Sequence, residues 1–337
     1  MALKSFMDGM LPAIELELQQ VVARLDEQGT AQFHEMLTYH MGWSGTANGP
    51  ETTGKRIRPL LLLSTCAACG MDWQPALPVA SCMELIHNFS LAHDDIQDGS
   101  ELRRGRLTVW KMWGAAQAIN VGDALFILAH LALFAIKGKY PPDMVLRVGE
   151  IVDEACLALS KGQFLDIAYE KQADLSTEKY WQMVSGKTGA LLAACTQIGA
   201  LLGGADEIKQ GNYRNFGHYL GLAFQAQDDF LGIWGDSALT GKSIESDLLA
   251  GKKTLPVIYG LSKNGLFARR WAEGTIHVEE VIQLSEQLAR EGAKTYTQDA
   301  ANQMTNQALN SLYAADPHGL AGEALFDLAN KLLNRQA

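Results

Sequence analysis

The sequence is poor in cysteine, and what it has does not form a disulfide framework. Its five cysteines lie at positions 66, 69, 82, 156 and 195, and one must remain unpaired. Cys66 and Cys69 form a lone CxxC, which lacks the second pair of ligands that a structural zinc site needs. Reduced thiols in an intracellular chain explain this pattern best, so we expect a cytoplasmic protein.

Basic charge is also scarce. Lys and Arg total 28 against 38 Asp and Glu in 337 residues, which gives a formal net charge of -10. A surface that binds the phosphate backbone of nucleic acid needs the opposite balance. We therefore expect no nucleic-acid partner.

Long apolar runs are absent as well. The first ten residues, MALKSFMDGM, lack the apolar core of a signal peptide. Residues 125–136 are interrupted by His130, and residues 190–202 by Thr196 and Gln197. Both runs are shorter than the roughly 20 residues that span a bilayer. We expect buried core helices and no transmembrane segment.

Alternating β-branched residues are almost missing, whereas apolar residues at helical spacing are abundant. The sequence predicts an all-α protein that forms a single domain over residues 1–337, a helical bundle with central helices buried on every side. We expect helices at 11–39, 58–69, 77–98, 115–137, 144–169, 177–202, 207–234 and 255–261, and three more toward the C-terminus.

Two acidic clusters each end an apolar helix. Asp94 and Asp98 of HDDIQD stand one turn apart on one helical face, and Asp228 and Asp229 lie in FQAQDDFLGIWGD. A single cluster has a plain alternative, a solvated helix end. Two clusters in one helical chain favour carboxylates that face each other over a cavity and share Mg²⁺ ions and a diphosphate.

Basic residues stand beside these carboxylates. Cations gather in the segment GKRIRP at residues 54–59 and in RRGR directly after the first cluster, and further lysines follow glycines at Lys187, Lys242 and Lys252. Cations close to carboxylates favour recognition of a polyanion, partly through metal and partly through guanidinium groups. A salt-bridged surface loop is the alternative for either basic segment taken alone.

Taken in order, GKRIRP, HNFSLAHDDIQD with RRG, GKTGALLAA, FQAQDDFLGIWGD, TGK and GKKTLP resemble the trans-isoprenyl diphosphate synthases, also called polyprenyl synthetases. The resemblance runs from about Gly54 to Gly260. It implies the type I isoprenoid synthase fold, an all-α bundle around a deep central cavity, in a homodimer. It also implies head-to-tail condensation of isopentenyl diphosphate with dimethylallyl, geranyl or farnesyl diphosphate.

The resemblance assigns roles to individual residues. Asp94 and Asp98 would bind two Mg²⁺ ions with the allylic diphosphate, Asp228 would bind a third, and Asp95 and Asp229 would support them. The residues that would hold the allylic diphosphate are Arg103, Lys187 and Lys252, with Lys242 as a further cation. Those that would hold isopentenyl diphosphate are Lys55, Arg58, His87 and Arg104.

The same resemblance places Lys187, Thr188 and Gln225 near an allylic carbocation, with the released pyrophosphate as the base. For His87 and Gln225 the alternative is a buried polar residue satisfied by a neighbour. One position departs from the family: Gly232 stands where many members have the third aspartate of a DDxxD motif. We expect Asp228 to suffice, with Asp236 near it.

Product length should depend on the helix that carries Asp94. Phe89 and Ser90 lie five and four residues before it. In the family, two large aromatics there generally give a fifteen-carbon product, whereas one at the earlier position resembles synthases of the twenty-carbon product. This favours geranylgeranyl diphosphate, although residues further down, such as Cys82 and Met83, could override the prediction.

Other functions stay open at this point. One is a farnesyl or longer-chain diphosphate synthase. Another is a class I terpene cyclase, because Asp228, Gly232 and Asp236 have the i, i+4, i+8 spacing of the cyclase metal motif. A third is the noncatalytic subunit of a heteromeric synthase, although such subunits usually have eroded acidic clusters and this chain retains both.

Overall fold

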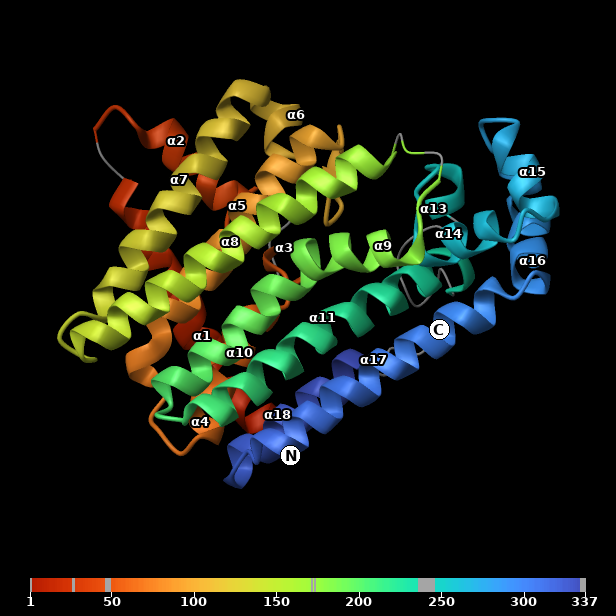
Figure 1. The fold of residues 1–337 in the computed structure, drawn as a ribbon. Coiled ribbons are helices and arrows are strands. Elements are labelled where there is room, and N and C mark those ends of the chain that lie inside the picture. Colours follow the sequence, from red (N-terminus) through yellow and green to blue (C-terminus); the bar gives the residue numbers. More distant parts are fainter. Residues whose placement is uncertain are drawn as a thin grey trace. The chain divides into compact units, whose positions relative to one another are not determined.

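The computed structural model describes residues 2–25, 28–45, 50–170, 172, 174–235 and 246–333, and most of these are helical (Figure 1). The only sheet among them is a hairpin of two short antiparallel strands, β1 (Leu102–Arg103) and β2 (Arg106–Leu107). The all-α prediction is confirmed. The hairpin escaped prediction because strands of two residues are too short to show a period.

The chain forms two compact units. Unit 1 comprises residues 1–153, 195–210 and 317–325, and unit 2 comprises 154–194, 211–316 and 326–337. The helices α8 (Pro142–Glu170), α10 (Ala190–Leu202), α11 (Glu207–Trp234) and α18 (Gly319–Leu333) contribute residues to both. That residues 1–337 act as one domain stays a prediction.

Unit 1 is built around α5, which packs on α7, α4 and α1. Its helices are α1 (Ala2–Val22), α2 (Ala31–His40), α3 (Pro50–Thr53), α4 (Ile57–Ala68), α5 (Leu77–Gln97), α6 (Val109–Trp113) and α7 (Ala115–Leu133), with 3₁₀ turns η1 (Ala23–Leu25), η2 (Gln74–Ala76) and η3 (Phe134–Ile136). Residues 78–86 of α5 are buried on all sides, as its apolar sequence predicts. The approach of α5 to α7 depends on Gly122, where a Cβ would lie 2.2 Å from His93 Nε2.

Unit 2 packs α14 against α17, α15 and α9. Its elements are α9 (Thr177–Val184), the π-helical turn η4 (Ser185–Gly189), α13 (Ser246–Leu249), α14 (Leu255–Ser262), α15 (Leu266–Ala272), η5 (Val278–Glu280), α16 (Val281–Arg290) and α17 (Ala293–Ala315). Ser176 caps α9 by accepting a hydrogen bond from the Lys179 amide. One apolar core joins Tyr180, Leu222 and Leu255, so it fixes α9, α11 and α14 around the second acidic cluster.

Three predictions about the helices differ from the structure, two of them for single helices and one for the number of helices after α14. The helix expected at 11–39 is two, α1 and α2, and Gly29 between them has a φ of +98°, a conformation that a continuing helix does not allow. The helix expected at 177–202 contains the π-helical turn η4, and four α-helices rather than three follow α14. Boundaries of this kind depend on packing more than on pattern.

The apolar segment at α7 is longer than the interrupted run at 125–136 indicated. Among the described residues, Ala115–Ile136 is the one helical segment long and apolar enough to cross a membrane, and 44% of its most apolar window is buried within the protein. Core helices of proteins without membrane spans meet the same criterion, so this is weak evidence for a span. The absence of a transmembrane segment and the cytoplasmic location stay predictions.

Candidate active site

The first acidic cluster lies in the last turn of α5, in unit 1. Asp95 points inward and is 2% exposed, whereas Asp94 is partly buried and Asp98, at the C-cap, is exposed. Asp94 and Asp98 share one helical face because they stand four residues apart. The helix therefore presents two accessible carboxylates to a ligand and keeps the third for internal contacts.

Asp95 uses that inward position to hold Arg103 of β1. Arg103 Nε donates to Asp95 Oδ1 at 2.7 Å, and Arg103 Nη2 lies 3.5 Å from Asp94 Oδ2. Burial raises the pKa of Asp95, and the charge and hydrogen bond of Arg103 oppose that rise. The hairpin thus places the guanidinium beside the first cluster, and this geometry agrees with a supporting role for Asp95.

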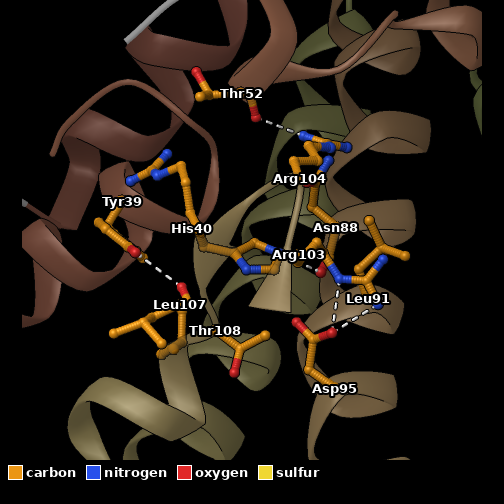
Figure 2. Close-up of a pocket in the computed structure, with 12 residues that line it drawn as sticks. Tyr39, His40, Thr52, Asn88, Leu91, Asp95, Arg103, Arg104, Leu107 and Thr108 are labelled. Carbon is orange, nitrogen blue, oxygen red and sulfur yellow. Dashed lines mark hydrogen bonds and ion pairs between the residues drawn. The ribbon is translucent and has the colours of Figure 1, made fainter. Parts of the chain in front are cut away.

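A pocket opens beside this ion pair (Figure 2). Dashed lines in Figure 2 join Arg103 to Asp95, Arg104 to the Thr52 carbonyl and Tyr39 to the Leu107 carbonyl. The pocket is lined by Tyr39, His40, Thr52, Asn88, Leu91, Asp95, Arg103, Arg104, Arg106, Leu107, Thr108 and Val109. Three arginines around one hollow make it strongly basic.

His40 lies in this pocket as a neutral group. Its Nε2 is 2.9 Å from the Asn88 carbonyl oxygen. Burial, with a further contribution from the positive charges of Arg103, Arg104 and Arg56, lowers the pKa of His40 to about 3. A neutral ring at neutral pH donates through Nε2 to that carbonyl.

The three cations of the basic segment at residues 54–59 have different environments, and one of them is taken up by internal ion pairs. Arg56 is buried, and it forms ion pairs with Glu15 at 2.6 Å and Glu84 at 3.0 Å, so it stabilises the fold. Lys55 is exposed, whereas Arg58 Nε is buried and has no hydrogen-bond partner among the described residues. An unpaired buried guanidinium N–H fits a site that an anion completes.

The four residues predicted to hold isopentenyl diphosphate all lie in unit 1. Burial, and then the charges of Arg58 and Arg104, place the pKa of His87 well below its ordinary value. Arg104 Nη1 donates to the Thr52 carbonyl at 2.9 Å, and a Cβ at Gly54 would lie 2.6 Å from Arg104 Nη2. The structure thus brings Arg104 against the segment that leads into Lys55, and His87 into the electrostatic field of Arg58.

The second acidic cluster lies on α11, in unit 2, and is organised by Asp229. This carboxylate is 4% exposed and accepts hydrogen bonds from Tyr180 OH at 2.7 Å, the Leu255 amide at 2.8 Å and Gln225 Nε2 at 2.8 Å. Burial raises the pKa of Asp229 to about 7, against the effect of these donors. Asp229 therefore ties α9, α14 and α11 together, whereas Asp228 beside it is partly buried.

The same network reaches the GKTG segment. Thr188 Oγ1 donates to Gln225 Oε1 at 3.2 Å, so Thr188, Gln225 and Asp229 form one chain of hydrogen bonds. Lys187 Nζ donates to Asp166 Oδ2 of α8 at 2.5 Å. The π-helical turn η4 carries both Lys187 and Thr188. Such turns occur often at functional sites.

The segment after the second cluster places its lysines differently. Lys252 has an exposed side chain, and its amide donates to the Asp247 carbonyl at 3.0 Å. Lys253 instead donates to the carbonyls of Tyr169, Glu170 and Gln172 at the end of α8. Lys242 and Asp236 lie outside the described residues, so the predictions for them stay predictions.

The predicted chain-length residues lie on α5 beside α7. The Phe89 ring packs on the Phe126 ring at 5.0 Å and on the His93 ring at 5.4 Å. Ser90 Oγ donates to the His87 carbonyl of its own helix at 2.7 Å. Of the two predicted chain-length residues, Phe89 contributes a ring to this aromatic contact and Ser90 does not.

The carboxylates of the two acidic clusters fit a hard divalent ion whose remaining ligands come from a substrate. Among the described residues no three His, Cys, Asp or Glu side chains form a ready-made metal cage. Mg²⁺ is commonly held by one or two carboxylates together with phosphate oxygens and water. The accessible carboxylates of Asp94, Asp98 and Asp228 meet that description.

Sequence reasoning missed several residues that the structure brings to these clusters. They are Tyr39, His40, Asn88, Asp166, Tyr180 and Asp247. Except for Asn88, which lies on α5 within the first motif, each lies on a different element from the motif that it contacts, so no local spacing indicates it. That the two acidic clusters face each other stays a prediction.

The sequence and the fold both match known proteins. The sequence model described as polyprenyl synthetase matches residues 47–287. The chain is 36% identical over 330 residues to a (2E,6E)-farnesyl diphosphate synthase of Mycobacterium tuberculosis, covering 95% of this chain and 90% of that protein. It is 42% identical over 231 residues to a geranylgeranyl diphosphate synthase of the same organism, covering 67% of this chain and 65% of that one.

The fold also matches solved structures of the same family. A polyprenyl synthase from Caulobacter crescentus, crystallised with calcium and isoprenyl diphosphate, is 27% identical with a TM-score of 0.83, and the match covers 99% of this chain and 98% of that one.

Proposed function

Because this chain belongs to the polyprenyl synthetase family and is a prenyl diphosphate synthase, we propose that its product is geranylgeranyl diphosphate. The proposal rests on Phe89 and Ser90. Phe89 is the one aromatic side chain of the pair and is packed on Phe126, whereas the small Ser90 bonds back to its own helix. Relatives of both product lengths are similar to this chain, so this local feature carries the choice.

Mg²⁺ is part of the proposal. Asp94 and Asp98 would hold two ions and Asp228 the third, each together with oxygens of the allylic diphosphate. When bound, the ions would neutralise the diphosphate and make it a better leaving group. The calcium and isoprenyl diphosphate in the Caulobacter crescentus enzyme support this use of a divalent cation.

The protein's own residues then divide the work. Arg103, Lys187 and Lys252 bind the allylic diphosphate, and Lys55, Arg58, His87 and Arg104 bind isopentenyl diphosphate through cations alone. Lys187, Thr188 and Gln225 present their polar atoms to the charge that develops on the allylic carbon. The departing pyrophosphate takes the proton that completes the condensation.

We also propose that the protein is a homodimer formed through α7. Large apolar side chains stay exposed along this helix: Ile119 is 46%, Ile127 57% and Leu131 46% exposed. They stand eight and four residues apart, so they follow one face of the helix. The exposed Asp123 interrupts this row between Ile119 and Ile127. Exposed apolar side chains gathered on one helical face are nevertheless characteristic of a protein–protein interface.

The test of the reaction is an incubation of the purified protein with isopentenyl diphosphate and, separately, dimethylallyl, geranyl or farnesyl diphosphate, with and without Mg²⁺. We expect a linear twenty-carbon product that forms only with Mg²⁺, identified by mass after dephosphorylation. A fifteen-carbon or longer product would contradict the assignment of Phe89. Hydrocarbon from an allylic diphosphate alone would favour a cyclase, and no turnover would indicate a missing partner subunit.

A further inference from the structure

Residue 56 has an unusual backbone conformation beside the predicted isopentenyl diphosphate site. Arg56 is the N-cap of α4, with φ +47° and ψ +39°, which is the left-handed helical region. Residues other than glycine, asparagine and aspartate rarely adopt this region, so the surrounding structure has to hold them there. Arg56 stands between Lys55 and Arg58, the two predicted diphosphate-binding cations of its segment. The backbone at residue 56 therefore sets the direction of Lys55 relative to Arg58.

The side chain of Arg56 is held by groups from three other parts of unit 1. It is 2% exposed. Its Nε lies 2.6 Å from Glu15 Oε1 of α1, and its Nη1 lies 3.0 Å from Glu84 Oε1 of α5. Its Nη2 donates to the carbonyl oxygen of Met41, the C-cap of α2, at 3.3 Å. A guanidinium with three fixed partners cannot turn without breaking these contacts, so they hold the backbone of residue 56 as well.

The two carboxylates that bind Arg56 are themselves fixed. Trp43 Nε1 donates to Glu15 Oε2 at 2.8 Å, and Asn88 Nδ2 donates to Glu84 Oε1 at 3.2 Å. Burial disfavours the charged form of Arg56, but the two carboxylates outweigh burial and raise the pKa of Arg56. Arg56 therefore stays charged in the interior, and its ion pairs persist.

Glu84 also acts on the cations of the diphosphate site. Burial lowers the pKa of Arg58 and of Arg104, and the negative charge of Glu84 opposes that effect at both. The direct ion pair of Glu84 is with Arg56, whereas Arg58 Nε has no hydrogen-bond partner among the described residues. Arg56 thus takes up a buried negative charge and leaves Arg58 able to bind an anion.

We infer that Arg56 is a positioning residue for isopentenyl diphosphate. Its ion pairs with Glu15 and Glu84 hold residue 56 in the left-handed conformation. That conformation directs Lys55 and Arg58 to the same diphosphate, and the pairing with Arg56 keeps Glu84 from neutralising Arg58. The inference rests on the proposed function, because it needs isopentenyl diphosphate to bind at these cations.

The test compares two substitutions that remove the same side chain. Arg56→Gly and Arg56→Ala both lose the ion pairs, but glycine adopts a positive φ without strain and alanine does not. Glu15→Gln weakens one ion pair and leaves Arg56 in place. The matched control is Glu150→Gln, which removes an exposed ion pair with Arg147 on α8. If loss of Arg56 prevents folding, both substitutions are repeated together with Glu84→Gln, which removes the carboxylate left without a partner.

Calorimetric titration with isopentenyl diphosphate in EDTA gives the Kd, and steady-state kinetics with Mg²⁺ give separate KM values for isopentenyl and geranyl diphosphate. We expect Glu15→Gln to raise the Kd and the KM for isopentenyl diphosphate roughly tenfold, because small displacements of binding groups have effects of this size or larger. The KM for geranyl diphosphate should stay close to that of wild type. Arg56→Ala should weaken isopentenyl diphosphate binding more than Arg56→Gly does, and Glu150→Gln should change neither substrate.

Equal affinities of Arg56→Gly and Arg56→Ala, or a Glu15→Gln protein that behaves like the control, would overturn the inference while the proposed function stands. An equal rise in KM for both substrates would overturn it too, because that result indicates a general defect of the fold. A wild-type protein that neither binds isopentenyl diphosphate nor turns it over would instead overturn the proposed function, and the inference with it.

Discussion

At the scale of single residues, the two adjacent aspartates of α11 have the same side chain but different environments. Asp228 and Asp229 are adjacent aspartates, yet Asp229 is buried and accepts three hydrogen bonds, whereas Asp228 is only partly buried. Each donor comes from a different helix or from α11 itself. Asp229 therefore has a structural role at the site, and the contribution of each hydrogen-bond donor can be tested by substituting that donor alone.

Tyr180→Phe removes one donor to Asp229 and leaves the ring in the core. We expect the free energy of unfolding to fall by about 1–3 kcal/mol, because a buried acceptor loses a partner. Turnover should fall as well, since Asp228 and Gln225 share the helix that Asp229 fixes. Chemical denaturation and steady-state kinetics measure the two effects, and a variant with wild-type stability would contradict this account of Asp229.

His40 gives a prediction for pH. Its folded pKa of about 3 lies below the ordinary value of 6.5, so between these values the unfolded chain binds more protons than the folded one. Stability from this group is fully present above pH 6.5 and is lost as pH falls toward 3. Wild type should lose about 1–2 kcal/mol more between pH 7 and pH 5 than His40→Gln does. Equal losses in the two proteins would show that His40 is not held neutral.

At the scale of elements, close packing of α8 against η4 sets the place of Lys187. A Cβ on Gly162 of α8 would lie 2.1 Å from the Lys187 backbone nitrogen, and a Cβ on Gly186 would lie 2.7 Å from the Ala158 carbonyl oxygen. Side chains at either position would force the two elements apart. Glycine here is required by the approach of two backbones.

Gly162→Ala should therefore displace η4 and weaken the Lys187–Asp166 ion pair. We expect kcat/KM to fall at least tenfold and the melting temperature to drop, because backbone atoms cannot move aside as a flexible side chain can. Gly149→Ala on the same helix is the matched control: nothing lies within 4 Å of its Cβ, and alanine there should stabilise α8 by up to about 1 kcal/mol. Similar behaviour of the two variants would refute the packing argument.

At the scale of the whole molecule, the exposed face of α7 predicts self-association. Ile127→Glu places a charge at the centre of that face and should shift the protein from dimer to monomer, as measured by light scattering coupled to size-exclusion chromatography. Ile208→Glu, at a 79% exposed apolar residue of α11 outside that face, should leave the dimer intact. A wild-type monomer, or a dimer that Ile127→Glu does not disturb, would contradict the proposed interface.

Sequence by itself determined the helical class and the two acidic clusters, because helical period and the i, i+4 spacing of carboxylates are local properties. The chemistry followed from the resemblance of its motifs to those of the polyprenyl synthetases. Tertiary structure alone decided which members of each motif are available. It buried Arg56 against Glu15 and Glu84, turned Asp95 toward Arg103, and placed Asp247 in the side-chain volume of Gly232. These contacts join residues on different elements, so they depend on how the elements pack, which the spacing within any one helix does not encode.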